Sequence, residues 1–139
     1  MILLDTSGLL SAIDSAQPAH AAAVAVLSHS PGPFVLSPFV LAELDYLIGR
    51  RVGSAAQRAL LRDVAAGAYR LAPFAESDVD RASQIIDKYA DLGIGLADAS
   101  VVVLAERGGT LDVLTLDERH FRTLRGPGGR PFRLLPSDV

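Results

Sequence analysis

The sequence contains no cysteine, which excludes a disulfide-stabilised fold, thiolate metal ligands and a cysteine nucleophile. Tryptophan is also absent, and aromatic residues make up only 6% of the chain although 50% of its residues are hydrophobic. The core must therefore be built from Leu, Val, Ile and Ala, as is usual in α/β proteins. Any metal ion must be held by oxygen or imidazole ligands.

Long apolar runs are missing as well. No stretch approaches the roughly 20 uncharged apolar residues that a membrane-spanning helix needs. The first residues carry no positive side chain and reach an acid at Asp5, so they do not resemble a signal peptide. We expect a cytoplasmic protein with no membrane association.

Basic residues are absent before Arg50, and the formal net charge is −3. Towards the end of the chain the balance reverses, because Asp138 is the only acid among several arginines. These are Arg119, Arg122, Arg125, Arg130 and Arg133. An ordinary solvated C-terminal face explains this pattern, and charge alone favours that explanation over a nucleic-acid surface. Bound metal would nevertheless make the acidic part of the surface less negative.

Short apolar runs alternate with segments of helical composition over the whole chain. We expect strands at residues 2–4, 34–36, 69–74, 112–116 and 132–135. We expect helices at residues 9–13, 18–28, 38–50, 55–66, 78–89 and 97–105. Such alternation predicts right-handed crossovers and a parallel sheet with helices on both faces. No repeat or internal boundary interrupts it, so residues 1–139 are interpreted as one domain.

Four acids occupy positions where a carboxylate is unexpected. Asp5 and Asp117 each follow a predicted strand, at the sheet edge where ligands bind in open parallel sheets. Asp98 lies near the start of an otherwise apolar helix, and Glu43 lies among apolar neighbours in another. Buried acids are rare unless they are paired or bound to metal.

If these four acids meet, they repel one another unless a cation is present. Oxygen ligands without cysteine, and without histidine at ligand spacing, favour Mg²⁺ or Mn²⁺ over Zn²⁺. Such an ion activates water for in-line attack on a phosphodiester. Each acid also has an ordinary explanation: helix capping for Asp5 and Asp117, the favourable first helical turn for Asp98, and an exposed helix face for Glu43. All four together are much less probable by chance.

Hydroxyl groups next to these acids are candidates to contact a metal-bound water or a phosphate, although local capping explains them equally well. They belong to Thr6, Ser7, Ser100 and Thr115. The three histidines, His20, His29 and His120, show no metal-ligand spacing. Only His120, beside Arg119 and Asp117, is a candidate to touch RNA.

Four segments resemble the PIN-domain nucleases, and within them the VapC toxins of bacterial toxin–antitoxin pairs. The similarity covers nearly the whole chain and is specific through the order and spacing of its motifs. The segments are Ile2-Leu3-Leu4-Asp5-Thr6-Ser7, Ser37-Pro38-Phe39-Val40-Leu41-Ala42-Glu43-Leu44, Gly95-Leu96-Ala97-Asp98-Ala99-Ser100 and Leu114-Thr115-Leu116-Asp117-Glu118-Arg119-His120-Phe121.

The resemblance implies a three-layer α/β/α sandwich with a mainly parallel sheet of four to five strands. It implies that Asp5, Asp98 and Asp117 bind Mg²⁺ or Mn²⁺ directly, that Glu43 acts through water or positions the nucleophile, and that Ser7 and Thr115 support these ligands. It further implies a homodimeric endoribonuclease toxin that cuts tRNA or rRNA loops and is inhibited by a VapB-type antitoxin, whose tail enters the active-site groove.

Three other functions remain open at this point. A PIN nuclease acting in RNA processing or decay would share the same acids. A phosphatase or receiver-like module using Asp5 lacks both a second aspartate two residues later and a lysine near Asp117. A non-catalytic binding module would show no stabilisation by metal. The apolar stripe formed by Val40, Leu44, Leu47 and Ile48 fits a core, a dimer interface or an antitoxin groove, and a core is the default.

Overall fold

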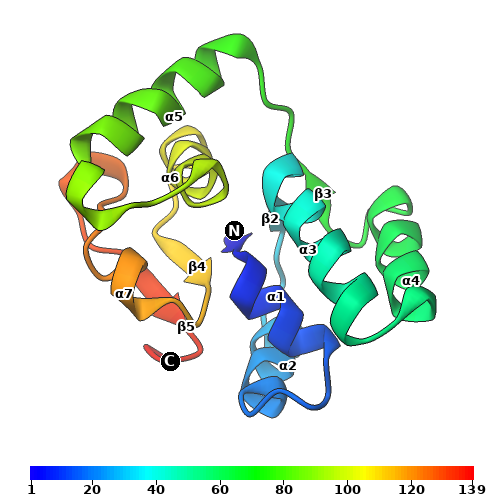
Figure 1. The fold of residues 1–139 in the computed structure, drawn as a ribbon. Helices are drawn as coiled ribbons and strands as arrows, with labels where there is room; N and C mark the ends of the chain where they lie inside the picture. The colour runs from blue at the N-terminus through cyan, green and yellow to red at the C-terminus, as the bar shows by residue number, and fades with distance from the viewer.

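Short apolar runs form the strands of a five-stranded parallel sheet in the order β3-β2-β1-β4-β5. The computed structural model describes all residues from Met1 to Val139. The strands are β1 (Ile2–Leu4), β2 (Phe34–Leu36), β3 (Arg70–Leu71), β4 (Asp112–Leu114) and β5 (Arg133–Leu135). The central strand is therefore the first in the sequence, and β2 and β4 pair with its two sides (Figure 1).

Seven α-helices flank this sheet and give the expected three-layer α/β/α arrangement (Figure 1). They are α1 (Thr6–Ile13), α2 (His20–His29), α3 (Pro38–Arg51), α4 (Ser54–Ala65), α5 (Glu76–Lys88), α6 (Leu96–Gly108) and α7 (Glu118–Phe121). Two short 3₁₀ segments, η1 (Ala90–Leu92) and η2 (Pro127–Gly129), complete the chain. No helix combines the length and the hydropathy that a membrane span requires.

The predicted fold class is confirmed, and the predicted strands and helices occur in the expected order. The short helix α7 was not predicted, and the other differences lie mainly at element ends. The strand expected over residues 69–74 shortens to Arg70–Leu71, because it is an exposed edge strand and Pro73 follows it. Helix α5 begins at Glu76, two residues earlier than predicted. There the Asp78 carboxylate accepts a hydrogen bond from the Ala75 backbone N–H at 2.9 Å, which stabilises the first turn of the helix.

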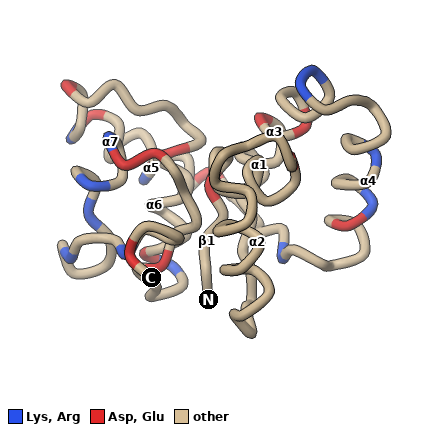
Figure 2. Tube along the Cα trace, turned by 90° about the horizontal axis from the view of Figure 1, so that it is seen from below, with Lys and Arg blue, Asp and Glu red and all other residues tan.

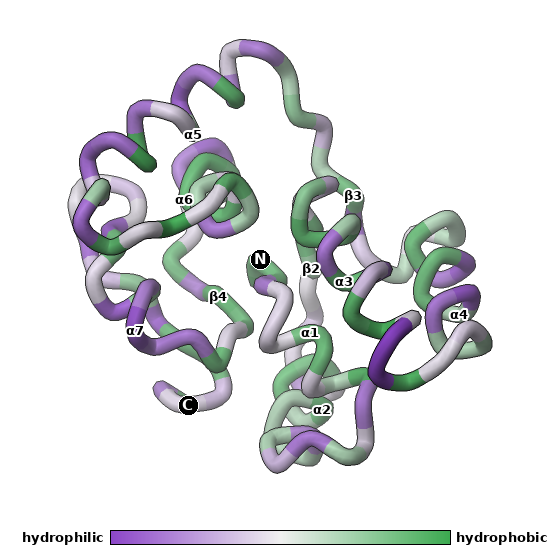
Figure 3. Tube along the Cα trace, in the orientation of Figure 1, coloured by the Kyte–Doolittle hydropathy of each residue, from purple (hydrophilic) through white to green (hydrophobic).

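One cluster of 29 buried apolar residues fills the space between sheet and helices. Helix α6 is apolar along most of its length and contacts both α5 and β1, whereas α5 alternates between polar and apolar faces (Figure 3). Val40, Leu44 and Ile48 of α3 are fully buried and Leu47 is half-buried. The apolar stripe therefore belongs mainly to the core, as the default interpretation expected.

Gly8 allows the first turn of α1 to approach strand β4 closely. A Cβ atom at this position would overlap the Leu114 carbonyl group and lie 2.8 Å from the Leu114 side chain. Since the overlap involves backbone atoms, a rotamer change cannot relieve it. The Asp5-Thr6-Ser7-Gly8 sequence thus brings the end of β1 and the end of β4 together.

We expect Gly8→Ala to destabilise the protein by roughly 1 to 3 kcal/mol through overpacking. Gly49→Ala is the matched control, because Gly49 also lies in a helix but its Cβ would face the flexible Gln57 side chain. That control should be neutral or stabilising, since alanine favours helices. Chemical denaturation of the three proteins measures both effects, and equal stability of the two variants would contradict the close-approach argument.

Candidate metal centre

The carboxyl ends of β1 and β4 bring Asp5 and Asp117 to the same edge of the sheet. Leu4 pairs with Leu114, and the Asp5 backbone N–H donates to the Leu114 carbonyl at 3.0 Å. Asp5 therefore lies opposite Thr115, two residues before Asp117. This juxtaposition is the one predicted from strand ends alone.

Asp98, Asp117 and His120 form the tightest group of potential metal ligands. The Nδ1 atom of His120 lies 3.1 Å from Asp98 Oδ2 and 2.8 Å from Asp117 Oδ2. One ligand atom from each residue falls within 4.8 Å of the other two. All three side chains are only partly exposed, which leaves the group open on one side to solvent or a ligand.

Asp5 is the most buried of the four predicted acids, with 4% of its surface exposed. Its Oδ2 atom accepts hydrogen bonds from Thr115 Oγ1 at 2.7 Å and from Ser7 Oγ at 3.2 Å. Burial nevertheless raises the pKa of Asp5 to about 6, with a smaller contribution from the negative charge of Asp98. The ionised form of Asp5 is thus disfavoured in the absence of a cation.

The hydroxyl groups of Ser7 and Thr115 connect Asp5 to the backbone that follows β4. Thr115 Oγ1 accepts from the Asp117 backbone N–H at 2.9 Å, and Ser7 Oγ accepts from the Leu116 N–H at 2.9 Å. Each hydroxyl has one proton, and both protons are used on Asp5. The two side chains therefore fix the position of Asp5 relative to Asp117.

Asp98 is placed by the first turn of α6 and faces two further acids. Its pKa is raised, mainly by burial and then by the negative charges of Asp117 and Glu43, while His120 acts in the opposite direction. Glu43 is exposed on α3, and no side chain forms an ion pair with it. Glu43 thus lies near enough to Asp98 to act on its charge, but it does not belong to the tightest ligand group.

A buried chain of hydroxyl groups connects α3 to α6. The Phe39 N–H donates to Ser37 Oγ at 3.1 Å, Ser37 Oγ contacts Ser100 Oγ at 2.7 Å, and Ser100 donates to the Ala97 carbonyl at 2.6 Å. Because the Ser100 proton is used on Ala97, Ser37 must be the donor between the two serines. Ser100 is therefore occupied within the core and touches none of the four acids.

Helix capping, the ordinary explanation for Asp5 and Asp117, applies to Asp117 but not to Asp5. Asp5 occupies the N-cap position of α1 but makes no side-chain capping bond. Asp117 does cap α7, because its Oδ1 accepts from the His120 backbone N–H at 3.0 Å. Its other oxygen remains directed at the His120 ring. Capping therefore explains the position of one oxygen of Asp117, and it does not explain the presence of Asp5.

His120 is the one member of this group that the sequence analysis did not predict as a metal ligand. Its partners lie in different elements, Asp117 at the start of α7 and Asp98 in α6, so no linear ligand motif exists. The available signal was the spacing of three residues between Asp117 and His120, which places both side chains on one face of a helical turn. The preference for Mg²⁺ or Mn²⁺ over Zn²⁺ consequently loses the part of its basis that came from histidine spacing.

A divalent ion fits the group by its donor chemistry. The His120 Nδ1 atom is buried and makes no aligned hydrogen bond, and the atoms next to it are carboxylate oxygens. These acids and this imidazole nitrogen require a proton or a metal ion between them. Asp98, Asp117 and His120 could hold such an ion, with Asp5 beside them.

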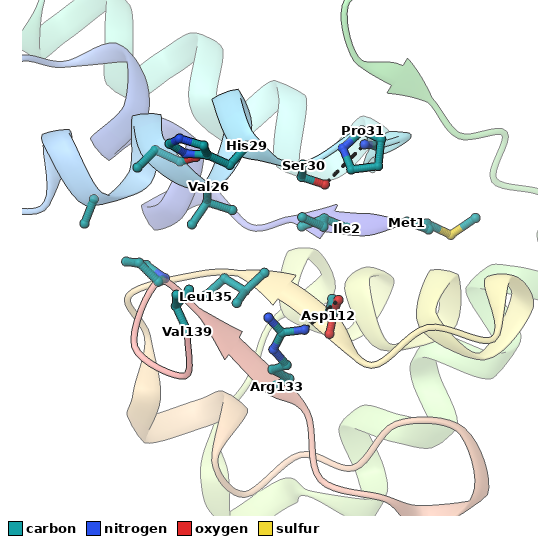
Figure 4. Close-up of a pocket in the computed structure, with 14 residues that line it drawn as sticks. Met1, Ile2, Val26, His29, Ser30, Pro31, Asp112, Arg133, Leu135 and Val139 are labelled. Carbon is teal, nitrogen blue, oxygen red and sulfur yellow. Dashed lines mark hydrogen bonds and ion pairs between the residues drawn. The ribbon is translucent and has the colours of Figure 1, made fainter.

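An apolar groove of about 560 Å³ lies elsewhere in the molecule, between α2 and the segment around β5 (Figure 4). Ile2, Val26 and Leu135 line it, and an ion pair between Arg133 and Asp112 closes one side at 3.5 Å. None of the four predicted acids lines this groove. The candidate metal centre is therefore a small polar cluster rather than the larger apolar groove.

The comparisons with known proteins agree with this fold. The model of the PIN domain family matches residues 2–126. Ribonuclease VapC26 of Mycobacterium tuberculosis is 47% identical over 135 residues, which cover 97% of this chain and all of that relative. The chain therefore belongs to the PIN-domain family, and within it to the VapC group.

Two solved structures share the fold. The sarcin-ricin loop cleaving toxin VapC20 of Mycobacterium tuberculosis superposes with a TM-score of 0.79 at 20% identity, over 84% of this chain and 90% of that one. VapBC2 from Rickettsia felis, bound to a DNA fragment from its promoter, gives a TM-score of 0.67 at 18% identity. That match covers 96% of this chain and 98% of the other.

We expect Asp5→Asn to stabilise the metal-free protein at pH 7.5 by roughly 1 to 3 kcal/mol, because it removes a buried charge. The neutral form of Asp5 is the one that the folded protein favours, since burial raises the pKa of Asp5 to about 6. The stability that neutral Asp5 contributes is fully present below the ordinary pKa of an aspartate and is lost as the pH rises through 6. Melting temperatures in EDTA at pH 3.5 and pH 7.5 measure this. Asp87→Asn, an exposed acid on α5, is the control and should change little. An Asp5→Asn variant less stable than wild type at pH 7.5 would refute the argument.

Proposed function

We propose that this chain is a metal-dependent endoribonuclease toxin whose site is formed by Asp5, Glu43, Asp98 and Asp117. The observation that carries the proposal is the convergence of Asp98, Asp117 and His120 beside buried Asp5, at the carboxyl edge of the sheet. The 47% identity to a protein named as a ribonuclease supports RNA as the substrate. Mg²⁺ or Mn²⁺ is the proposed ion, since most of the ligand atoms are carboxylate oxygens.

Each side chain has a proposed role that follows from its position in the site. Asp98 and Asp117 would hold the ion from two elements, and Asp5 would contribute from the end of β1, where Thr115 and Ser7 fix it. When bound, a divalent ion would supply an activated water and stabilise charge on the leaving oxygen. Exposed Glu43 would orient the attacking water and receive its proton.

The reaction is a hydrolysis of the phosphodiester. The water oxygen forms a new bond to phosphorus while the bond from phosphorus to the 3′ oxygen breaks. Its products are a 3′-hydroxyl, which takes up a proton, and a 5′-phosphate.

The arginine-rich C-terminal segment offers phosphate contacts at only some of its positions. Arg122 is bound to Glu118 and Asp138, and Arg133 is paired with Asp112. Arg125 donates to backbone carbonyls. Exposed Arg119 makes no ion pair and lies two residues after Asp117, so we assign it to a phosphate near the cleaved bond. Figure 2 shows Lys and Arg around α7 and on α4, and none on α1 or α2.

The proposed partners follow from the VapC relationship. We propose inhibition by a VapB-type antitoxin, and a basic tail of such a partner fits a cluster of acids without nearby lysine or arginine partners. VapBC2 shares the fold of this chain, and this likeness of fold is the support that it gives to a partner of this kind. The homodimer and the cytoplasmic location stay predictions from the sequence. Residues 1–139 are proposed to act as one nuclease domain, since β1 is central and β5 closes the same sheet.

We expect purified protein to cut cellular RNA at discrete sites with Mg²⁺ or Mn²⁺ and not with EDTA. Asp98→Asn should reduce cleavage by at least about a hundredfold, because it removes an ion ligand shared by the whole cluster. Asp87→Asn is the control for loss of one negative charge and should cleave normally. Sequencing the cut ends identifies the target. Cleavage by Asp98→Asn at the wild-type rate, with wild-type melting behaviour, would refute the proposed site.

A further inference from the structure

His120 presents a ring nitrogen to two acids in an arrangement that needs a proton or a metal ion between the atoms. Its Nδ1 atom is 2.8 Å from Asp117 Oδ2 and 3.1 Å from Asp98 Oδ2, and it has no other polar partner. Ionised carboxylates only accept hydrogen bonds, and a neutral ring with an unprotonated Nδ1 also only accepts there. Either a proton or a metal ion must therefore lie between these atoms.

The spacing of these atoms suits neighbouring ligands of one ion. Two adjacent ligands of an octahedral ion, each about 2.1 Å from the metal and at right angles, lie about 3.0 Å apart. The separations of 2.8 and 3.1 Å from Nδ1 bracket that value. In addition, Asp117 Oδ1 accepts the His120 backbone N–H, which fixes both ligands on the same turn of α7.

The other two histidines use the same atom differently. His20 Nδ1 lies 2.8 Å from the Ser11 carbonyl, and His29 Nδ1 lies 2.7 Å from the Ala25 carbonyl. In both rings Nδ1 must carry a proton and donate it, which prevents metal binding through that atom. Only His120 directs Nδ1 at carboxylates.

We propose that His120 binds the divalent ion through Nδ1 together with Asp98 and Asp117, and that this nitrogen ligand makes the site prefer Mn²⁺ to Mg²⁺. Imidazole is a good ligand for transition-metal ions, whereas Mg²⁺ selects hard oxygen ligands. A group composed only of carboxylates would discriminate less between the two ions. The inference rests on the proposed metal-dependent function and specifies which ion serves it best.

Metal binding by His120→Gln tests the assignment without relying on activity. Mn²⁺ and Mg²⁺ are titrated separately into wild type, His120→Gln and His29→Gln, with calorimetry for both ions and pulsed EPR for Mn²⁺. His29→Gln is the matched control, because it also removes one imidazole but lies on α2. We expect His120→Gln to weaken Mn²⁺ binding about tenfold or more and Mg²⁺ binding less than about threefold. The EPR coupling to a bound nitrogen should disappear only in His120→Gln.

If His120 does not bind the ion, its removal should change the metal affinities in the opposite direction. If His120 is only a protonated counter-ion of the two acids, removing it abolishes a competitor, and both ions then bind as tightly as in wild type or more tightly. That outcome, or an absent nitrogen coupling in wild type, overturns the His120 assignment and leaves the nuclease proposal standing. Wild-type protein that binds neither ion would instead refute the metal dependence itself. Melting curves of His120→Gln and of His120→Asn establish that the comparison concerns folded protein.

Discussion

The negative charge gathered at the carboxyl edge of the sheet is the constraint on which the other features of the site depend. Asp5 is almost inaccessible to water, and partly buried Asp98 lies near the negative charges of Asp117 and Glu43. Such a cluster costs folding free energy when it is ionised and unaccompanied. The two hydroxyl groups on Asp5 and the ring of His120 reduce that cost only in part, since the pKa of Asp5 remains at about 6.

The fold was largely predictable because hydrophobic alternation determines it. Five apolar runs form the five strands, and the positions of Asp5 and Asp117 after strand ends predicted that both lie on one edge of the sheet. Element ends were less predictable, since an exposed edge strand such as β3 has no buried face to give it a pattern. The place of His120 among the potential ligands was not predicted, because its contact with Asp98 depends on how α6 and α7 pack.

Asp117 shows that a structural role and a chemical role need not exclude one another. One oxygen of its carboxylate caps the short helix α7, and the other faces the His120 ring of that same helix. The cap fixes the carboxylate in one orientation, so its second oxygen is directed at the cluster before any ion arrives. Ligands that are already oriented lose less conformational entropy on binding.

The hydroxyl chain from Phe39 through Ser37 and Ser100 to Ala97 has a consequence for the relative motion of two helices. It is buried, and each of its protons has a single available acceptor, so sliding α3 along α6 would break a hydrogen bond with no water to replace it. Glu43 is carried by α3 and Asp98 by α6. The buried pair of serines therefore helps to fix the separation of these two acids, although neither serine contacts either acid.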